Sequence, residues 1–300
     1  MVESRNQGVF DTFKKTLKDF NELVAFEHTI FSLPFIIIAM ITASYSVEEG
    51  MQWFGWRLFI LGILAAMSAR NFAMAFNRYC DRDIDIKNPR TKNRPSVDGR
   101  VNSFKILVFI CLNALAFIGI AYCINFLAFI LSFPILGILA LYSYMKRFSS
   151  LAHLVLGLSL GLAPIAGVVA IDEAIPYWAI FLSLGVIFWV AGFDILYSLQ
   201  DVEFDKKENL HSIPTKFGVK GAINISRFFH VCTIIFWSIF LYSSPLGGIA
   251  YLAVVLSAAM LAYEHILVAR DFCHIPKAFF VVNGYLGIAF LVILIMDVML

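Results

Sequence analysis

The sequence predicts an all-α membrane protein, a polytopic bundle of about nine transmembrane helices in two related halves. Of its 300 residues, 60% are hydrophobic and only 15% are charged, against about 45–50% and about 25% in soluble domains. Apolar runs of about 20 residues, the length that crosses a bilayer, recur along the chain. This composition excludes a soluble single domain, a disordered chain and a nucleic-acid-binding protein.

The first element is a charged segment, residues 1–25, that precedes the apolar runs. Its apolar side chains recur at helical spacing and its lysines fall on the other side. This pattern predicts an amphipathic helix lying on the surface of anionic lipid. The apolar positions are Phe10, Phe13, Leu17, Phe20 and Val24, and the lysines are Lys14, Lys15 and Lys18.

Residues 26–300 form the second predicted unit, a single domain of nine spans that each meet the length of a membrane helix. The predicted spans are His28–Tyr45, Trp56–Ala75, Phe104–Tyr122, Phe126–Tyr144, Leu151–Ile171, Tyr177–Leu199, Ile223–Tyr242, Leu246–Ala269 and Ala278–Val298. If the N-terminus is cytoplasmic, all but one of the 23 lysines and arginines lie on the cytoplasmic side, Arg57 being the exception. Because positive charge is retained on that side, we expect a cytoplasmic N-terminus.

The residues that could take part in catalysis or metal binding lie at two long inner loops, one after the second span and one after the sixth. Asn77, Asp81 and Asp85 are each four residues apart and therefore share one face of a continued helix. The second set, Asp194, Tyr197, Asp201 and Asp205, shares a face in the same way. The repeated spacing suggests two related halves that bring the loops face to face.

Oxygen ligands on two facing helices at a membrane surface suit a hard cation such as Mg²⁺, which one or two carboxylates bind together with phosphate oxygens. Lysines and arginines stand in the same loops and would pair with phosphate. A solvated loop whose acids merely balance its bases explains either motif alone, but less readily both together. A secondary transporter is a further alternative, although its acids would lie at the membrane midplane.

Both motifs resemble the signatures of the UbiA family of intramembrane prenyltransferases. Asn-x-x-x-Asp-x-x-x-Asp at 77–85 is followed by Arg90-Thr-Lys-Asn-Arg94-Pro, and Asp-x-x-Tyr-x-x-x-Asp-x-x-x-Asp at 194–205 is followed by Ser212-Ile-Pro. Tyr142-Ser-Tyr-Met-Lys146-Arg147 is similar to the family's tyrosine and Lys-Arg element. The likeness covers essentially the whole chain and is nearest to the 4-hydroxybenzoate polyprenyltransferases.

The resemblance implies Mg²⁺-dependent transfer of a polyprenyl group from its diphosphate to an aromatic ring, most simply 4-hydroxybenzoate on the ubiquinone route. A naphthoate-type acceptor of menaquinone synthesis is the runner-up. The implied setting is the inner membrane of a bacterium, with the site opening to the cytoplasm. The partners are therefore a polyprenyl diphosphate, an aromatic acid and the lipid bilayer.

The expected roles follow from this chemistry. Two Mg²⁺ ions are expected, one held by Asn77, Asp81 and Asp85 and the other by Asp201 and Asp205. The diphosphate-binding cations are Lys92, Arg94, Lys146, Arg147 and Lys206. Asp194, with Tyr197 beside it, would polarise or deprotonate the ring substituent. Arg70 and Asn71 are candidates for the acceptor carboxylate.

Overall fold

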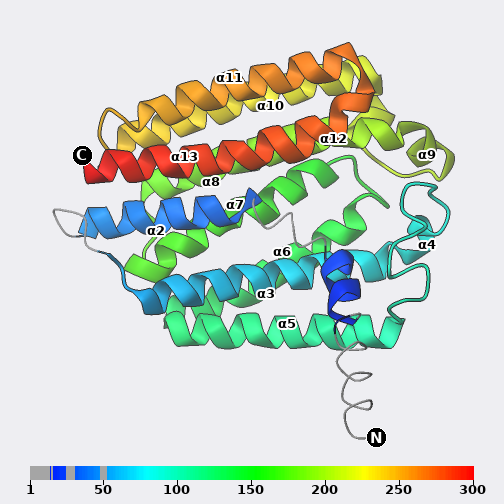
Figure 1. Cartoon of the computed structure of the whole chain (residues 1–300), viewed down its shortest axis with the longest axis horizontal. Coiled ribbons are helices and arrows are strands. Elements are labelled where there is room, and N and C mark those ends of the chain that lie inside the picture. The colour runs from blue at the N-terminus through cyan, green and yellow to red at the C-terminus, as the bar shows by residue number, and fades with distance from the viewer. Residues whose placement is uncertain (1–13, 15, 25–30, 48–52) are drawn as a thin grey trace, which may run out of the picture.

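The chain folds as a bundle of helices that lie side by side (Figure 1). This computed structural model describes residues 14, 16–24, 31–47 and 53–300. Within those residues eight helices are long and apolar enough to cross a membrane, and a ninth, α2, is shorter. The predicted all-α bundle of about nine spans is therefore confirmed, although residues 28–30 of the first predicted span lie outside the described ranges.

The helices follow in the order that the apolar runs predict. The long ones are α2 (Leu33–Val47), α3 (Trp56–Cys80), α5 (Ser103–Ile124), α6 (Phe126–Met145), α7 (Ala152–Asp172), α8 (Tyr177–Ser198), α10 (Ile213–Ser243), α11 (Tyr251–Arg270) and α13 (Asn283–Met299). Short elements join them: α4 (Arg82–Asp85), η2 (Leu199–Asp201), α9 (Val202–Lys207), η3 (Phe272–His274), α12 (Ile275–Lys277) and η4 (Ala278–Val282).

Helix α10 begins ten residues before its predicted span, at Ile213 instead of Ile223. Ser212 starts it with a capping box, in which its hydroxyl and that of Thr215 each accept the other residue's backbone N–H, so that two orphan donors are satisfied. Gly218, at φ 71°, then kinks the helix, a conformation that glycine adopts without steric cost. The first turns are polar and therefore lie outside any hydropathy window.

Helix α8 lies at the centre of the bundle, packed against α7 on one side and α10 on the other. At Gly157 of α7 a Cβ atom would stand 2.3 Å from the Ile187 carbonyl oxygen, so the two backbones touch there as small residues in membrane helices allow. The large buried rings Trp189, Trp237 and Phe35 fill the core around α8. This packing holds the end of α8, which carries the second motif.

The described part of the N-terminal segment packs on the protein. Residues 16–23 are helical, and Leu23 and Val24 are buried against α3 and α5. Arg100 forms ion pairs with Glu22 at 2.5 Å and with Asp19 at 3.5 Å. Phe10, Phe13 and Lys15 lie outside the described residues, and the placement of the segment on a lipid surface stays a prediction.

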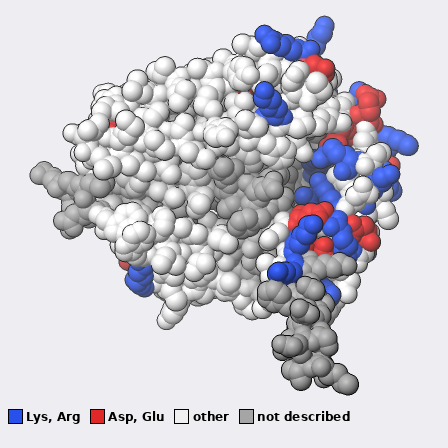
Figure 2. All heavy atoms as spheres, viewed as in Figure 1, with Lys and Arg blue, Asp and Glu red and all other residues white. Residues whose placement is uncertain are grey.

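Most charged side chains gather at one end of the bundle, over α4 and α9, while the rest of the surface in this view carries only a few (Figure 2). The apolar flanks match a bilayer-spanning bundle, in which ionisable groups avoid the hydrocarbon. The charged end is where α3 and α8 finish and where both acidic motifs lie.

Candidate active site

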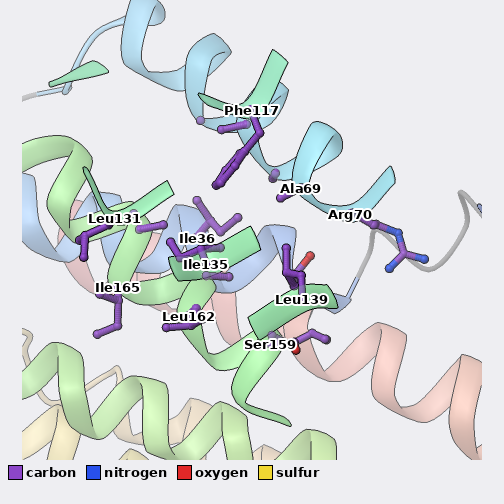
Figure 3. Close-up of a pocket in the computed structure, with 18 of the residues that line it drawn as sticks. Ile36, Ala69, Arg70, Phe117, Leu131, Ile135, Leu139, Ser159, Leu162 and Ile165 are labelled. Carbon is purple, nitrogen blue, oxygen red and sulfur yellow. The ribbon is translucent and has the colours of Figure 1, made fainter. Parts of the chain in front are cut away.

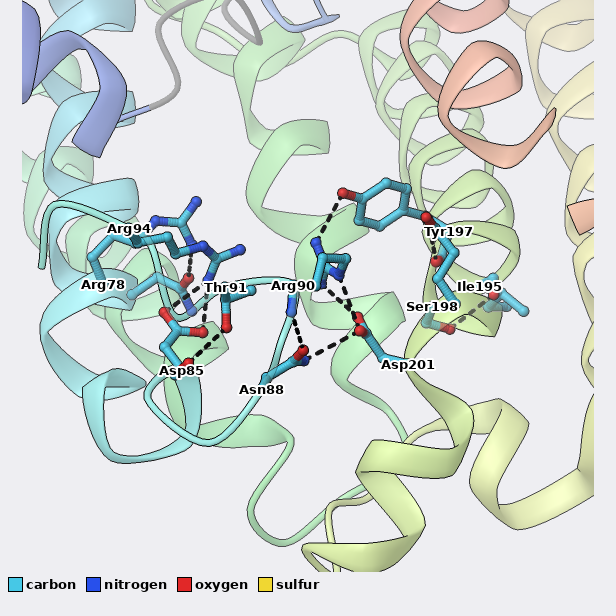
Figure 4. Close-up of polar contacts among 12 residues, drawn as sticks. Arg78, Asp85, Asn88, Arg90, Thr91, Arg94, Ile195, Tyr197, Ser198 and Asp201 are labelled. Atoms are coloured by element: carbon cyan, nitrogen blue, oxygen red, sulfur yellow. Dashed lines mark hydrogen bonds and ion pairs between the residues drawn. The ribbon is translucent and has the colours of Figure 1, made fainter. Parts of the chain in front are cut away.

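A polar cavity of about 210 Å³ lies at the charged end of the bundle. Both motifs line it: Asn77, Asp81 and Asp85 from one side, and Asp194, Tyr197, Asp201 and Asp205 from the other. Figure 4 shows Asp85 and Arg94 on one wall and Tyr197 and Asp201 on the facing wall, with Arg90 reaching between them. The two loops that the sequence predicts to meet therefore form one site.

The first motif continues the direction of α3 only in part. Helix α3 ends at Cys80, Asp81 is its cap, and α4 adds one more turn to Asp85. The Asn77 amide nitrogen donates to Asp81 Oδ2 at 2.8 Å. Burial raises the pKa of the Asp81 carboxyl to about 6, although Lys146 opposes the shift. Asp81 is thus an acid whose desolvation outweighs the positive charge of Lys146 and Arg147 nearby.

Asp85 is buried and paired with Arg94, whose Nη1 donates to both carboxylate oxygens at 2.7 Å. The Thr91 hydroxyl donates to the Asp85 carbonyl oxygen at 3.0 Å. These two contacts turn the loop after α4 back toward Asp85, and Arg94 lines the cavity.

The second motif leaves α8 through a single 3₁₀ turn, η2, before α9 begins. Arg90 holds Asp201 with two hydrogen bonds, from Nε to Oδ1 at 3.0 Å and from Nη2 to Oδ2 at 2.5 Å. Asp205 is 3% exposed, and its Oδ2 is buried without a hydrogen-bond partner. The two acids of this motif therefore differ: Asp201 forms an ion pair with an arginine, whereas Asp205 keeps a buried oxygen without a hydrogen-bond partner.

Arg90 and Asn88 are site residues to which the sequence prediction assigns no role. Asn88 donates to Asp201 Oδ1 at 3.2 Å and accepts from the Arg90 backbone N–H at 2.9 Å. Arg90 Nη1 donates to the Tyr197 hydroxyl at 3.2 Å, and its guanidinium lies 5.4 Å from the centre of that ring. The sequence feature that could have indicated Arg90 is the basic run from Arg90 to Arg94. The partner of Arg90, Asp201, lies 111 residues further along the chain, where no local pattern relates the two.

Five cations are predicted to bind diphosphate, and the structure separates them. Arg94 and Lys146 line the cavity. Burial opposes the charge of Lys146, but Tyr142, Asp205 and Asp194 outweigh it and raise the pKa of the ammonium group. Arg147, Lys92 and Lys206 are exposed and do not line the cavity.

Two of these outer cations are engaged elsewhere on the surface. Arg147 pairs with Asp83 at 2.7 Å, and Lys206 stands 3.7 Å from Glu203. Asp83 and Glu203 are off the ligand faces, as the four-residue spacing of the motifs requires. A diphosphate in the cavity would therefore meet Arg94 and Lys146 first.

Asp194 lies deeper in the bundle, on the α8 face that lines the cavity. The His153 ring hydrogen-bonds its Oδ2 through Nδ1 at 2.7 Å. His153 comes from α7 and is fully buried. No spacing rule relates this histidine to a residue 41 positions away, so the sequence pattern does not indicate its role.

An apolar cavity of about 180 Å³ adjoins the polar one. Figure 3 shows apolar side chains such as Phe117, Leu131 and Leu162 around it, with Arg70 at one edge. The two cavities share part of their lining: Arg70, Met74, Tyr142, Leu156 and Leu160. Asn71, the neighbour of Arg70, lines neither cavity.

The carboxylates suit a divalent cation that is shared with a substrate. In the described part of the chain, no three Asp, Glu, His or Cys groups converge closely enough to hold a metal alone. Asp205 nevertheless keeps a buried oxygen without a hydrogen-bond partner, and at Asp81 the effect of burial outweighs that of the nearby cations Lys146 and Arg147. Mg²⁺ is commonly bound by one or two carboxylates with phosphate oxygens and water, so this donor set fits Mg²⁺ and a diphosphate together.

Comparisons with known proteins agree with this site. The model of the UbiA prenyltransferase family matches residues 32–294. A 4-hydroxybenzoate octaprenyltransferase from Marinomonas sp. (strain MWYL1) is 34% identical over 208 residues, which cover 67% of this chain and 70% of the relative.

Solved structures of UbiA homologues share the fold. The apo structure of a homologue from Aeropyrum pernix K1 matches with 32% identity and a TM-score of 0.81, over 91% of this chain and 98% of that one. A homologue from Archaeoglobus fulgidus bound to GPP and Mg²⁺ has the same fold at 20% identity, with a TM-score of 0.74, over 94% and 100% of the two chains.

Proposed function

The chain belongs to the UbiA prenyltransferase family, and we propose that it transfers a polyprenyl group from polyprenyl diphosphate to 4-hydroxybenzoate. The observation that carries this proposal is the junction of two cavities. A polar cavity lined by the acidic motifs shares its wall with an apolar cavity inside the bundle. This arrangement suits a substrate with a diphosphate head and a long hydrocarbon tail.

The polar cavity would bind the diphosphate and two Mg²⁺ ions. Asn77, Asp81 and Asp85 would hold one ion, and Asp201 and Asp205 the other. Bound Mg²⁺ would supply Lewis-acid neutralisation of the charge that develops on the leaving diphosphate. Because Asp85 and Asp201 are paired with arginines before substrate binds, we expect Arg94 and Arg90 to move from carboxylate to phosphate oxygens.

The cations would complete the diphosphate site. Arg94 and Lys146 line the cavity, where fixed positive charge acts strongly on an anion because little water screens it. Lys92, Arg147 and Lys206 lie outside that lining, and we assign them to capture of the diphosphate at the mouth. Their exposed charges would act mainly on the rate of association.

The apolar cavity would hold the first part of the prenyl tail, and the remainder would leave sideways into lipid. Its wall is mainly of aliphatic side chains from α2, α3, α6 and α7. Such a wall keeps water from an allylic cation, which water would otherwise quench.

Asp194 and Tyr197 would act on the acceptor, with Arg70 and Asn71 as candidates for its carboxylate. Asp194 accepts the proton of the acceptor hydroxyl, which makes the ring electron-rich. The ring carbon next to that hydroxyl bonds to the prenyl carbon as the C–O bond to diphosphate breaks. Diphosphate leaves with the bonding electrons and takes up the ring proton, whose loss restores aromaticity.

We further propose that the protein lies in the inner membrane of a bacterium, with its N-terminus and site on the cytoplasmic side. The distribution of lysine and arginine supports this orientation, since Arg57 alone falls on the other side. The curated relative from Marinomonas is bacterial. Residues 1–25 would lie against the cytoplasmic leaflet.

Mass spectrometry of the products tests the acceptor. The purified chain in lipid vesicles receives a polyprenyl diphosphate, Mg²⁺ and either 4-hydroxybenzoate, a bicyclic naphthoate or no acceptor. We expect a prenylated product with 4-hydroxybenzoate, and none once EDTA removes the metal. Product with the naphthoate alone would instead favour the menaquinone route, and no covalent product with any acceptor would contradict the proposal.

A further inference from the structure

His153 is a fully buried histidine at the second position of α7. Its ring spans two other helices, because Nδ1 lies 2.7 Å from Asp194 Oδ2 in α8 and Nε2 lies 3.3 Å from the backbone nitrogen of Ile213 in α10. Both ring nitrogens therefore have a partner, and one of those partners is an acid that the proposed reaction uses.

The second contact determines the tautomer of the ring. A backbone N–H can only donate, so Nε2 must accept the hydrogen bond from Ile213. A neutral imidazole then carries its single hydrogen on Nδ1 and donates it to the Asp194 carboxylate. In a doubly protonated ring, the Nε2–H donor would face the Ile213 N–H donor, and no hydrogen bond could form between them.

The hydrogen bond constrains what Asp194 can do. Donation from Nδ1 occupies Oδ2 and fixes the direction of the carboxyl group. The Asp194 side chain remains 14% exposed and lines the polar cavity. Oδ1 is therefore the oxygen that can turn toward an acceptor in the cavity.

The backbone N–H that binds Nε2 is held in place by a helix cap. Ile213 is the first residue of α10 and follows directly on Ser212, whose capping box with Thr215 fixes the start of that helix. The orientation of the Asp194 carboxylate thus depends on the end of the second motif loop. Partners that orient an active-site group in this way typically matter by about 10–100-fold in activity.

We propose that His153 is a positioning residue that holds the Asp194 carboxyl group aimed into the cavity. This inference rests on the proposed function, since it assigns Asp194 to the acceptor. It predicts that His153 affects the step in which Asp194 acts on the acceptor, and not the binding of the diphosphate at the metal-binding acids.

Three substitutions separate this role from simple packing. His153→Leu removes the donor and should lower kcat for prenyl transfer by about 10–100-fold. His153→Asn places an amide N–H near the position of Nδ1 and should recover part of that loss. His153→Gln places its amide near Nε2 and should not. Ser226→Ala serves as the control, because Ser226 is a buried hydrogen-bond link between α10 and α8 that lies away from both cavities.

The decisive readout is the slow release of diphosphate without acceptor, measured beside transfer on the same vesicles. For His153→Leu we expect this release and the KM for prenyl diphosphate to remain at the wild-type level. Loss of release in proportion to transfer would overturn the proposal, since it would mean that the diphosphate site had collapsed. Normal transfer in His153→Leu, or no gain in His153→Asn, would overturn it as well.

Nitrogen NMR of ¹⁵N-histidine protein tests the geometry without any acceptor. Comparison with the spectrum of His153→Asn identifies the signal of His153, because only that signal is lost. We expect it to be the signal of a neutral ring protonated at Nδ1. A ring protonated at Nε2 would overturn the inference. A chain that fails to prenylate 4-hydroxybenzoate would contradict the proposed function and leave this signal to decide the role of His153.

Discussion

The four motif carboxylates that are expected to bind metal have different surroundings in the cavity. Arginines neutralise Asp85 and Asp201, whereas Asp81 is desolvated and Asp205 has a buried oxygen without a partner. A buried polar atom that lacks a hydrogen bond costs about 1–3 kcal/mol. Asp81 and Asp205 are therefore retained at a cost in stability, as expected of groups that serve binding.

Asp205→Asn should separate function from stability. The amide removes a charge whose burial is unfavourable, so the free energy of unfolding should stay constant or rise by up to about 1 kcal/mol. Product formation should fall at least about 100-fold, because a metal-binding oxygen loses its charge. Thermal unfolding in detergent and the product assay measure the two effects.

The control for Asp205→Asn is Asp83→Asn, the same change on an exposed carboxylate that pairs with Arg147 outside the cavity. This variant should keep nearly full activity. Equal losses in both variants would contradict the assignment of Asp205 to the metal.

Asp194→Asn should lower kcat by about 10²–10⁴-fold, the usual contribution of a positioned acid or base. The KM for prenyl diphosphate should change little, since Asp194 lies deeper than the metal-binding acids. Steady-state kinetics with each substrate varied in turn measures this. Near-normal turnover would assign Asp194 to the packing of the bundle instead.

At the scale of elements, the loop after α4 and the loop after α8 are held together by a few long-range contacts. Arg90 provides the central one, with a bidentate pair to Asp201 and a further bond to Tyr197. Lys87 and Glu208 form a more exposed pair at 2.6 Å. A further bond joins the second loop to the end of α6, where the Lys146 carbonyl oxygen accepts from the His211 backbone N–H at 2.8 Å.

Arg90→Lys should loosen this connection. Lysine cannot form the bidentate contact, so we expect faster hydrogen exchange in residues 86–102 and a KM for prenyl diphosphate raised by about tenfold. Lys87→Ala is the matched control, because an exposed ion pair contributes at most about 1 kcal/mol. If both variants exchange alike, Arg90 is not the connection between the loops.

Helix positions follow from local pattern better than helix ends do. Apolar runs of bilayer length located the spanning helices because burial in lipid requires them. The start of α10 was missed because it depends on the Ser212 capping box and on a kink at Gly218. The packing of Leu23 and Val24 on α3 and α5 was also not predicted, because an amphipathic pattern does not say whether lipid or protein covers the apolar face.

In the whole molecule, the apolar cavity is lined by residues of α2, α3, α5, α6 and α7, all of which lie in the first two thirds of the chain. Its α3 wall is built from small residues that include Gly62, Ala65 and Ala66. Small side chains on that wall leave the space that a prenyl chain would occupy. The cavity thus exists only when α2, α3, α6 and α7 are assembled.

Ala66→Phe should fill part of this space and discriminate between chain lengths. We expect kcat/KM for a long polyprenyl diphosphate to fall at least about tenfold more than that for a short one, since the site for distal isoprene units is narrowed. Competition between the two substrates, read by product mass, measures the ratio.

Ala116→Phe is the control for Ala66→Phe, as an exposed alanine on α5 that lines neither cavity. It should leave the ratio unchanged. Equal effects on short and long substrates in Ala66→Phe would contradict the placement of the tail.

The sequence by itself determined the membrane class, the spans and the motif faces. These are local properties: hydropathy depends on neighbouring residues, and the four-residue spacing of Asn77, Asp81 and Asp85 follows from the helical repeat. The tertiary structure alone decided the partners of those residues. Arg90 meets Asp201 and His153 meets Asp194 across 111 and 41 positions, because separate helices must pack before such side chains can touch. The same packing places Arg94 and Lys146 in the cavity and leaves Arg147, Lys92 and Lys206 outside its lining.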